Sequence, residues 1–477
     1  MSNSEQSKPE QVQLLVLGGG PGGYTAAFRA ADLGLDVVLV EREATLGGVC
    51  LNVGCIPSKA LLHTAHIMDQ ARGLTAQGID FGEPELSLDK LRGWKESVVS
   101  KLTQGLAGLA RQRGVRLLRG EGRFTGPNSL VVHSEHGSRE LRFSKAIIAA
   151  GSRPARLPFL PEDPRILDST TALELEDIPE RLIVLGGGII GLELAAVYSA
   201  LGSRITVVEQ ADGLLPGCDR DLVEPLQKDL EQRYEALYTG TRVSGVQAHS
   251  GGLKVSFEGD RSAEIFDKLL CAVGRLPNGS LLNADKAGVQ VDDQGFIAVD
   301  EFQRSNVPHV LAIGDLAGGP MLAHKASHEG KVAAEVAAGL PVANEAQAIP
   351  SVVYTEPEVA WVGLTETQAQ RENRRYEKAS FPWMASGRAQ TLGAGGGLTK
   401  ILVDPDSGVL IGAGIVGPSA GELIAEATLA IELGLEPAEI GLTVHPHPTL
   451  SETLAFAAEA YEGTLTELYL GGKKPKS

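Results

Sequence analysis

The strongest constraint on this chain is a glycine pattern that occurs twice with the same spacing. In the first copy an apolar run at residues 12–17 leads into Gly18-x-Gly20-x-x-Gly23, a helical pattern follows, and a second apolar run ends at Glu41. Strand, glycine turn, helix and strand in this order predict a βαβ unit of a parallel sheet. The first glycine permits a tight turn, the second lets a pyrophosphate approach the backbone, and the third lets helix and strand pack closely. Glu41 stands where a carboxylate would bind a ribose hydroxyl.

The second copy runs from Gly186-x-Gly188-x-x-Gly191 to Glu209, and in both copies the acid follows the first glycine by 23 residues. The repeat predicts two dinucleotide-binding units of one architecture. A carboxylate at Glu209 would bind the 2′-hydroxyl of NAD and repel the 2′-phosphate of NADP, and no arginine cluster follows it. We therefore expect two different dinucleotides: a tightly held flavin and an exchanging nicotinamide, NAD rather than NADP.

A cysteine pair, Cys50 and Cys55, follows the first glycine pattern closely. The spacer lets the two sulfurs meet in a small ring, and Pro57 fits the first turn of a helix, whose positive end would favour the Cys55 thiolate. Four cysteines in 477 residues exclude a disulfide-stapled scaffold. The pair therefore indicates redox catalysis, against two alternatives: buried structural cysteines, and a zinc site, which lacks further ligands between Gly47 and Lys59.

A third cluster lies near the C-terminus, where His445 and His447 alternate with prolines and Glu452 follows. Prolines stiffen the backbone, and a nearby glutamate can orient an imidazole and raise its basicity. The pattern is consistent with a catalytic acid–base, with a metal ligand or with a structural histidine.

Size and charge set broader limits. A chain of 477 residues is too long for one core and suggests about three or four domains. The net charge of −17 argues against nucleic acid and anionic membranes and favours a basic protein partner. The first eleven residues resemble neither a secretory signal nor a transit peptide, and no apolar run is long enough to span a membrane, so we expect a cytoplasmic location. The basic tail at 471–477 is expected to be loose.

Together these motifs resemble the pyridine nucleotide–disulfide oxidoreductase family, over nearly the whole chain. Besides the two glycine patterns, the resemblance rests on Gly-Gly-Val-Cys-Leu-Asn-Val-Gly-Cys-Ile-Pro-Ser-Lys at 47–59 and on shorter motifs at 149–152, 273–275, 313–315 and 447–449. One departure is Ala150, where the family usually has threonine. The resemblance implies an α/β fold with two Rossmann-like dinucleotide-binding domains, for FAD at 1–152 and for NAD at 153–276. A central domain at 277–348 would complete the FAD site, and an α+β dimerisation domain would occupy 349–477.

The resemblance also implies the residues that contact each cofactor. FAD would lie against Gly18, Gly20, Gly23, Glu41, Gly47, Gly48, Lys59, Gly122, Gly151, Asp315 and Ala323. NAD would lie against Gly186, Gly188, Ile190, Glu209, Val243, Ala272, Gly274 and Arg275. No metal is expected.

The same resemblance implies the catalytic roles. One cysteine would exchange with a dithiol substrate and the other would face the flavin, and a lysine–glutamate pair would lie beside the flavin. A histidine oriented by a glutamate would serve the cysteines of the other subunit, which makes the active enzyme a homodimer. In this order the residues are Cys50, Cys55, Lys59, Glu193, His447 and Glu452.

Leu51 and Ser58 favour the branch of the family that oxidises protein-bound dihydrolipoamide with NAD⁺ as the E3 component of 2-oxo acid dehydrogenase complexes. Its partners would be the lipoyl domain and the subunit-binding domain of a dihydrolipoyl acyltransferase (E2), the latter meeting an acidic surface. The alternative is a glutathione-reductase-like NAD(P)H disulfide reductase, which would require arginines in place of Glu209. Mercuric reductases would require a further cysteine pair near the C-terminus, and a soluble transhydrogenase would lack the Cys50–Cys55 pair. A docking flavoprotein with an incidental disulfide is an alternative of another class.

Overall fold

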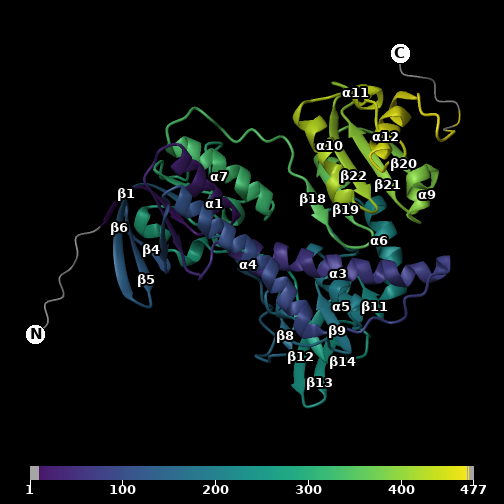
Figure 1. Cartoon of the computed structure of the whole chain (residues 1–477), viewed down its shortest axis with the longest axis horizontal. Coiled ribbons are helices and arrows are strands. Elements are labelled where there is room, and N and C mark those ends of the chain that lie inside the picture. The colour runs from purple at the N-terminus through teal and green to yellow at the C-terminus, as the bar shows by residue number, and fades with distance from the viewer. Residues whose placement is uncertain (1–9, 470, 472–477) are drawn as a thin grey trace, which may run out of the picture.

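The computed structural model describes residues 10–469 and 471, which form three units, each built on its own sheet (Figure 1). The expectations for the first nine residues, and for the basic tail from residue 472 onward, lie outside the described residues. Within the described residues, every helix is too short or too polar to cross a membrane. The main sheets of the three units are one mixed sheet, one parallel sheet and one antiparallel sheet, and this agrees with the predicted α/β class.

The first unit contains a seven-stranded sheet of order β3-β2-β1-β6-β5-β4, with β17 paired to β6. Helices α1 (Pro21–Asp32) and α7 (Ala323–Ala337) cover one face (Figure 1). Because β17 runs parallel to β6, the predicted central segment completes the first sheet. The strands are β1 (Glu10–Leu17), β2 (Val37–Glu41), β3 (Arg116–Arg119), β4 (Glu121–Gly126), β5 (Ser129–Ser134), β6 (Gly137–Ile148) and β17 (Val310–Ala312).

Side chains on β1 alternate between two cores, as expected for a strand buried on both faces. Leu14 and Val16 pack against the helix side, together with residues of α1 and α7. Leu15 and Leu17 pack on the other side, against β4 and β5. This double burial fixes the strand that leads into the first glycine turn.

The second unit repeats this design with a five-stranded parallel sheet of order β11-β10-β9-β15-β8. Helix α5 (Ile189–Ala200) covers one face and the antiparallel strands β12 to β14 cover the other. Helix α6 (Arg220–Arg233) packs against β22 of the C-terminal unit. The strands are β8 (Ile166–Leu167), β9 (Arg181–Leu185), β10 (Arg204–Val208), β11 (Ala236–Tyr238), β12 (Val243–His249), β13 (Gly252–Phe257), β14 (Glu264–Phe266) and β15 (Lys268–Cys271).

A short ribbon joins the first and second units. Strand β7 (Ser152–Pro154) pairs antiparallel with β16 (Arg275–Pro277), so the chain enters and leaves the second unit side by side. The ribbon lies where the sequence places the limits of the second domain; the four predicted domain limits remain predictions.

The helical region between the two units differs from its sequence prediction. The sequence pattern predicts a long helical stretch at about 59–113, whereas the structure has two helices, α3 (Cys55–Gly73) and α4 (Leu88–Gln112), with a 3₁₀ turn between them. Gly78 and Gly82 adopt φ values of +87° and +67° and Pro84 follows, which explains the interruption. The predicted helix start is confirmed, because α3 begins at Cys55 and Pro57 lies in its first turn.

The C-terminal unit is an antiparallel sheet of order β18-β19-β22-β21-β20 with helices packed on it (Figure 1). The strands are β18 (Ser351–Val353), β19 (Val359–Gly363), β20 (Glu377–Pro382), β21 (Leu398–Val403) and β22 (Leu410–Val416). The helices are α8 (Glu366–Glu372), α9 (Gly387–Thr391), α10 (Ala420–Glu432), α11 (Pro437–Leu442) and α12 (Glu452–Glu462).

A buried charge cluster, here called the Lys400 cluster, joins the second and C-terminal units. The Lys400 ammonium donates to Asp219 Oδ2 at 2.8 Å and to Asp221 Oδ1 and Glu366 Oε1 at 2.7 Å each, and its side chain is only 2% exposed. Asp219 also accepts the backbone N–H groups of Glu366 and Thr367, so it caps the first turn of α8. The three carboxylates lie close enough for a metal ion, but the lysine ammonium occupies their centre.

Candidate active site

Both glycine turns require glycine at their first and third positions. Gly18 has φ +107°, and a Cβ there would lie 2.3 Å from the Ala149 carbonyl oxygen. A Cβ on Gly23 would lie 1.8 Å from Gly18 O, which no side chain can tolerate. Gly186 (φ +106°) and Gly191 repeat this geometry. The two turns are therefore equivalent in structure as well as in sequence.

Packing within the chain does not require glycine at the second position of each turn. A Cβ on Gly188 would meet nothing within 4 Å, and a Cβ on Gly20 would make only an ordinary contact of 3.8 Å with Gly48. The chain itself has room for a side chain at both places. This open space beside a helix N-terminus fits the pyrophosphate of a dinucleotide, so the residues present fit both FAD and NAD.

The acid at the end of each unit is fixed by hydrogen bonds from its own turn. Glu41 Oε2 accepts the Gly19 N–H at 2.6 Å, and Glu209 Oε2 accepts the Gly187 N–H at 2.7 Å. The other oxygen of Glu209 accepts the Ala211 N–H at 2.7 Å. Each carboxylate is thereby oriented at the edge of its glycine turn, where a ribose would lie.

Two glycines connect the cysteine loop to the first turn. Gly47 N–H donates to Gly19 O at 2.8 Å, and a Cβ on Gly48 would lie 2.6 Å from Gly20 Cα. Helix α2 (Gly48–Val53), which carries Cys50, is therefore packed directly against the predicted FAD turn.

The cysteine pair is in the dithiol form, with Cys50 half-buried in α2 and Cys55 exposed at the start of α3. The hydrogen bond that Cys50 donates and the charge of Lys59 together lower the pKa of Cys55 to about 7, although burial and the charge of Glu193 oppose them. The same bond, together with burial, raises the pKa of Cys50. Near neutral pH, Cys55 is the thiolate of the pair and Cys50 the thiol.

Lys59 and Glu193 meet as the resemblance implied. Lys59 Nζ lies 2.7 Å from Glu193 Oε2 and 2.9 Å from Oε1, and the glutamate side chain is 5% exposed. The contact joins α3 of the first unit to α5 of the second. Tyr354, which the sequence did not single out, contributes its backbone N–H to Glu193 Oε1 at 3.2 Å.

The predicted flavin residue Asp315 and the predicted nicotinamide residue Arg275 are linked through Ser152. Ser152 Oγ donates to Asp315 Oδ2, and Arg275 Nε donates to Ser152 Oγ at 2.7 Å. Burial lowers the pKa of Arg275. The sequence analysis assigns no separate role to Ser152, and the structure places it between a predicted flavin residue and a predicted nicotinamide residue.

A buried ion pair supports the turn before Asp315. Lys325 and Glu329 of α7 lie 2.7 Å apart with side chains 7% and 6% exposed, and Glu329 accepts the Gly314 N–H at 2.7 Å. Sequence reasoning missed this pair. Its signal was a lysine and a glutamate four residues apart on an otherwise small and apolar helix face.

The remaining predicted cofactor positions are placed as follows. Gly122 is buried in β4, where a Cβ would lie 2.6 Å from Leu17 Cδ1, so packing alone accounts for that glycine. Gly151 and Gly274 have positive φ, Ile190 is the second residue of α5, Ala323 begins α7, Val243 begins β12, and Ala272 lies beside the second turn. The cofactor contacts of these residues remain predictions.

The two histidines near the C-terminus have different surroundings. Both ring nitrogens of His445 are engaged, by Glu426 and by Thr443 O at 2.8 Å each, which is the arrangement of a structural histidine. His447 Nδ1 lies 2.9 Å from Glu452 Oε1, and its side chain is 79% exposed. Among the described residues its Nε2 has no partner, so only His447 is available as an acid–base.

His447 does not meet the cysteines of its own chain. It lies just before α12, and Figure 1 shows α11 and α12 at the end of the C-terminal unit remote from α3. Val444 beside it is 95% exposed and Leu442 is 83% exposed. An exposed histidine among exposed apolar side chains indicates a surface that a second subunit covers.

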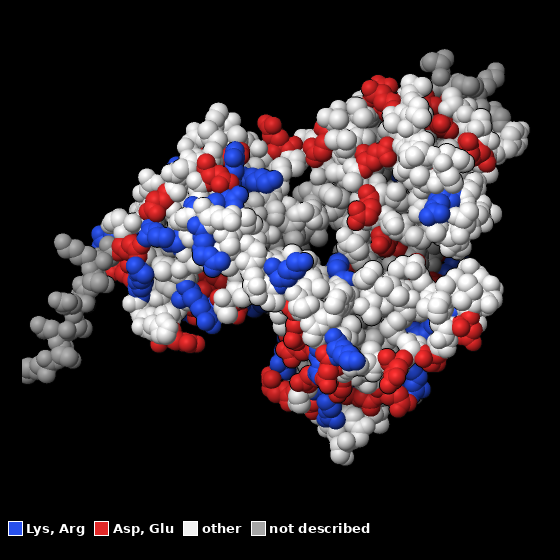
Figure 2. Space-filling view, in the orientation of Figure 1, with Lys and Arg blue, Asp and Glu red and all other residues white. Residues whose placement is uncertain are grey.

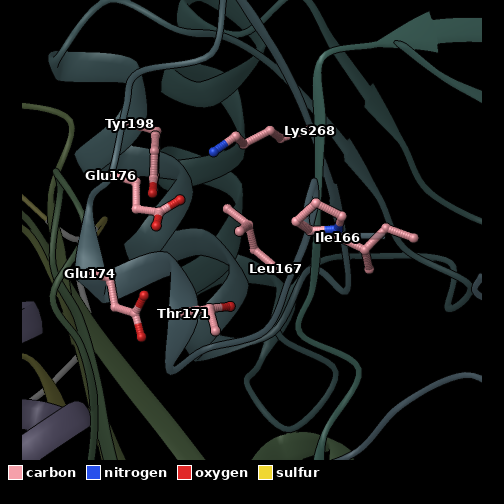
Figure 3. Close-up of a pocket in the computed structure, with 8 residues that line it drawn as sticks. Ile166, Leu167, Thr171, Glu174, Glu176, Tyr198 and Lys268 are labelled. Carbon is pink, nitrogen blue, oxygen red and sulfur yellow. The ribbon is translucent and has the colours of Figure 1, made fainter. Parts of the chain in front are cut away.

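A separate pocket of about 230 Å³ lies beside β8. Figure 3 shows its lining, in which Lys268 and Glu176 point inward near Tyr198. None of the predicted site residues lines it, so it is not the active site. Its residues are Pro164, Ile166, Leu167, Thr171, Glu174, Glu176, Tyr198 and Lys268.

Two dinucleotide turns, an acidic thiol beside the first of them and an exposed histidine–glutamate pair together define a dinucleotide-dependent disulfide oxidoreductase. The chain belongs to the pyridine nucleotide-disulphide oxidoreductase family, which residues 12–330 match; residues 349–458 match the dimerisation domain of that family. The family uses FAD and NAD, and its dimerisation domain supports a homodimer.

Individual relatives agree with this assignment. The chain is 54% identical to a dihydrolipoyl dehydrogenase of Vibrio cholerae, over 97% of this chain and 98% of the relative. It is 52% identical to one of Haemophilus influenzae, over 97% of both chains. Among solved structures, LpdA of Mycobacterium tuberculosis superposes with a TM-score of 0.86 at 26% identity, covering 94% of this chain and 99% of that one.

Proposed function

We propose that this chain is a dihydrolipoyl dehydrogenase, which oxidises protein-bound dihydrolipoamide to lipoamide and reduces NAD⁺. The observation that carries the proposal is the Cys50–Cys55 pair, packed against the first glycine turn with Cys55 as the more acidic thiol. Relatives of that name at 54% and 52% identity support the choice of substrate.

We assign residues 1–152 to FAD, 153–276 to NAD, 277–348 to completion of the FAD site and 349–477 to the dimer interface. Lys59 and Asp315 would hold FAD together with the first turn, and Glu209 would select NAD in the second. When bound, FAD would supply the two-electron chemistry that connects the reduced cysteine pair to NAD⁺.

The chain's own residues carry the thiol chemistry. Glu452 accepts a hydrogen bond from Nδ1–H of His447, which leaves Nε2 unprotonated as the proton acceptor. The partner subunit's His447 takes the proton of the first substrate thiol, and the resulting thiolate attacks Cys50 of the oxidised pair. The Cys50–Cys55 bond breaks, and Cys55 leaves as the stabilised thiolate.

The second half-reaction releases the product. The remaining substrate thiol loses its proton and attacks the substrate sulfur that is bonded to Cys50. The disulfide of lipoamide forms, and Cys50 leaves with its electron pair and takes up a proton. The Cys50–Cys55 pair is thereby left reduced.

Steady-state turnover with dihydrolipoamide and NAD⁺, beside glutathione disulfide and NADPH, tests this proposal. We expect a clear preference for the first pair of substrates, because Glu209 occupies the place where an NADP enzyme needs positive charge. Preference for glutathione disulfide and NADPH would instead establish the glutathione-reductase-like alternative.

We further propose that an acidic surface meets the basic subunit-binding domain of an E2 acyltransferase. Figure 2 shows that acidic side chains outnumber basic ones on the visible face of the C-terminal unit. Helix α10 alone carries Glu422, Glu426 and Glu432 and has no lysine or arginine. Binding that is insensitive to salt would contradict this electrostatic account. A cytoplasmic location remains our prediction.

A further inference from the structure

Lys59 lies between two groups that come from two other units of the molecule. On one side Glu193 of α5 accepts from its ammonium with both oxygens, at 2.7 and 2.9 Å. On the other side the ring of Tyr354, which directly follows β18, has its centroid 4.6 Å from Nζ. The first, second and C-terminal units therefore meet at this one ammonium.

The ring changes how firmly the lysine is held. Lys59 is 34% exposed, and a lysine of that exposure in a single ion pair retains several rotamers and gains little stability. Tyr354 acts on both members of this pair: its ring lies within cation–π distance of Nζ, and its backbone N–H holds Glu193 Oε1 at 3.2 Å. The ammonium thus has a fixed neighbour on each side.

The position of Lys59 matters because of Cys55. The two residues are four apart on α3, so they lie on the same face of the helix, one turn apart. The positive charge of Lys59 helps to lower the pKa of Cys55 and offsets part of the rise in the pKa of Cys50. A displaced ammonium would weaken this effect.

We propose that Tyr354 is a positioning residue of the redox pair, which holds Lys59 and Glu193 so that the ammonium favours the Cys55 thiolate. The inference rests on the proposed function. It also connects the C-terminal unit, through which subunits associate, to the thiol chemistry of the first unit.

Few other charged or titratable groups act on these residues. Cys55 is influenced by Cys50 of α2, by Lys59 of its own helix and by Glu193 of α5, and it acts in turn on Arg275 of β16. Tyr354 is influenced by Lys59, Glu193, Glu358 and Glu422. Burial raises the pKa of Tyr354, so its hydroxyl stays neutral while Cys55 titrates.

The test is a pH titration of the thiolate–flavin absorbance in holoenzyme reduced by two electrons. Tyr354→Leu removes the ring and keeps the backbone N–H, while Tyr354→Phe is the matched control that keeps the ring. We expect the leucine variant to raise the titration midpoint by about half a pH unit. We expect the phenylalanine variant to leave it unchanged. If Tyr354→Leu does not fold, Tyr354→Met fills the same space without a ring.

A double-mutant cycle separates positioning from a structural role. In a Lys59→Met background no ammonium remains to be positioned, so Tyr354→Leu is expected to have no effect on the midpoint. Equal shifts in both backgrounds, or no shift in either, would overturn the inference. If wild-type enzyme reduced by dihydrolipoamide shows no thiolate–flavin band, the proposed function itself is wrong. If the wild-type enzyme shows the band but Tyr354→Leu does not move its titration midpoint, the proposed function stands and only the role of Tyr354 is wrong.

Discussion

Replacing Lys400 with methionine is the perturbation whose cost the structure defines best. Lys400 is buried with three carboxylate acceptors, and removing one partner of a buried ion pair costs about 3–5 kcal/mol. Lys378 would still lie 2.7 Å from Asp221 and 2.8 Å from Glu366, so two of the three carboxylates keep a cation. Asp219 keeps only neutral donors. We therefore expect Lys400→Met to lower the free energy of unfolding by about 3 kcal/mol, the lower end of that range.

Urea unfolding of the holoenzyme measures this loss, with Lys378→Met as the matched control. Lys378 contacts two of the same carboxylates, but its side chain is 34% exposed and Lys400 remains beside them. An ion pair of that exposure contributes at most about 1 kcal/mol. A loss below about 1 kcal/mol for Lys400→Met, or equal losses for both variants, would refute the reasoning.

The pH dependence provides a second check. Burial opposes ionisation of Asp219, but hydrogen bonds from Lys400 and two backbone amides lower the pKa of this carboxyl below its ordinary value. The contribution of ionised Asp219 to the free energy of unfolding is therefore complete above about pH 4 and is lost as the pH falls further. Without Lys400 this carboxylate is destabilising when charged. The difference in unfolding free energy between wild type and Lys400→Met should be largest near pH 7 and shrink toward pH 4. A difference that does not change with pH would contradict the pairing of Asp219 with Lys400.

Three further predictions concern the active site. Cys55→Ser should abolish the thiolate–flavin absorbance of the reduced enzyme, which in wild type should fade as the pH falls through about 7, and persistence of the band would reassign the two sulfurs. Glu209→Gln should lower kcat/KM for NAD⁺ about tenfold relative to NADP⁺, measured by steady-state kinetics, and an unchanged ratio would remove Glu209 from cofactor selection. Cys50→Ser and His447→Gln should each cost at least about 100-fold in turnover. Their co-expression should restore about one quarter of wild-type activity, because each mixed dimer has one intact site, and no recovery would contradict a shared site.

Much of the site could be predicted because its signals are local. Each glycine turn lies within one βαβ unit, and the turn geometry that demands glycine is set by a few neighbouring residues. The helix start at Cys55 was visible from Pro57. The contacts of Lys59 with Glu193 and of His447 with Glu452 followed from the resemblance and are present.

The rest depends on contacts between distant segments. The Lys400 cluster gathers residues 219, 221, 366 and 400, and its only local trace is one lysine in an apolar strand. Tyr354 likewise lies far along the chain from Lys59, and nothing near it in sequence indicates an ammonium. No periodicity encodes such pairs, because their neighbours are brought together only by the packing of whole units.

The ribbon of β7 and β16 has a consequence for the order in which the protein is made. All five strands of the second sheet lie between these two strands, the last of them ending at Cys271. The first sheet is complete only when β17, beginning at Val310, reaches β6. On the ribosome, where domains fold as units while the chain emerges, the second sheet can close before the first. The first unit, although its synthesis begins earlier, is thus the later of the two to finish folding. The edge of its sheet at β6 stays unpaired until the second unit has already emerged.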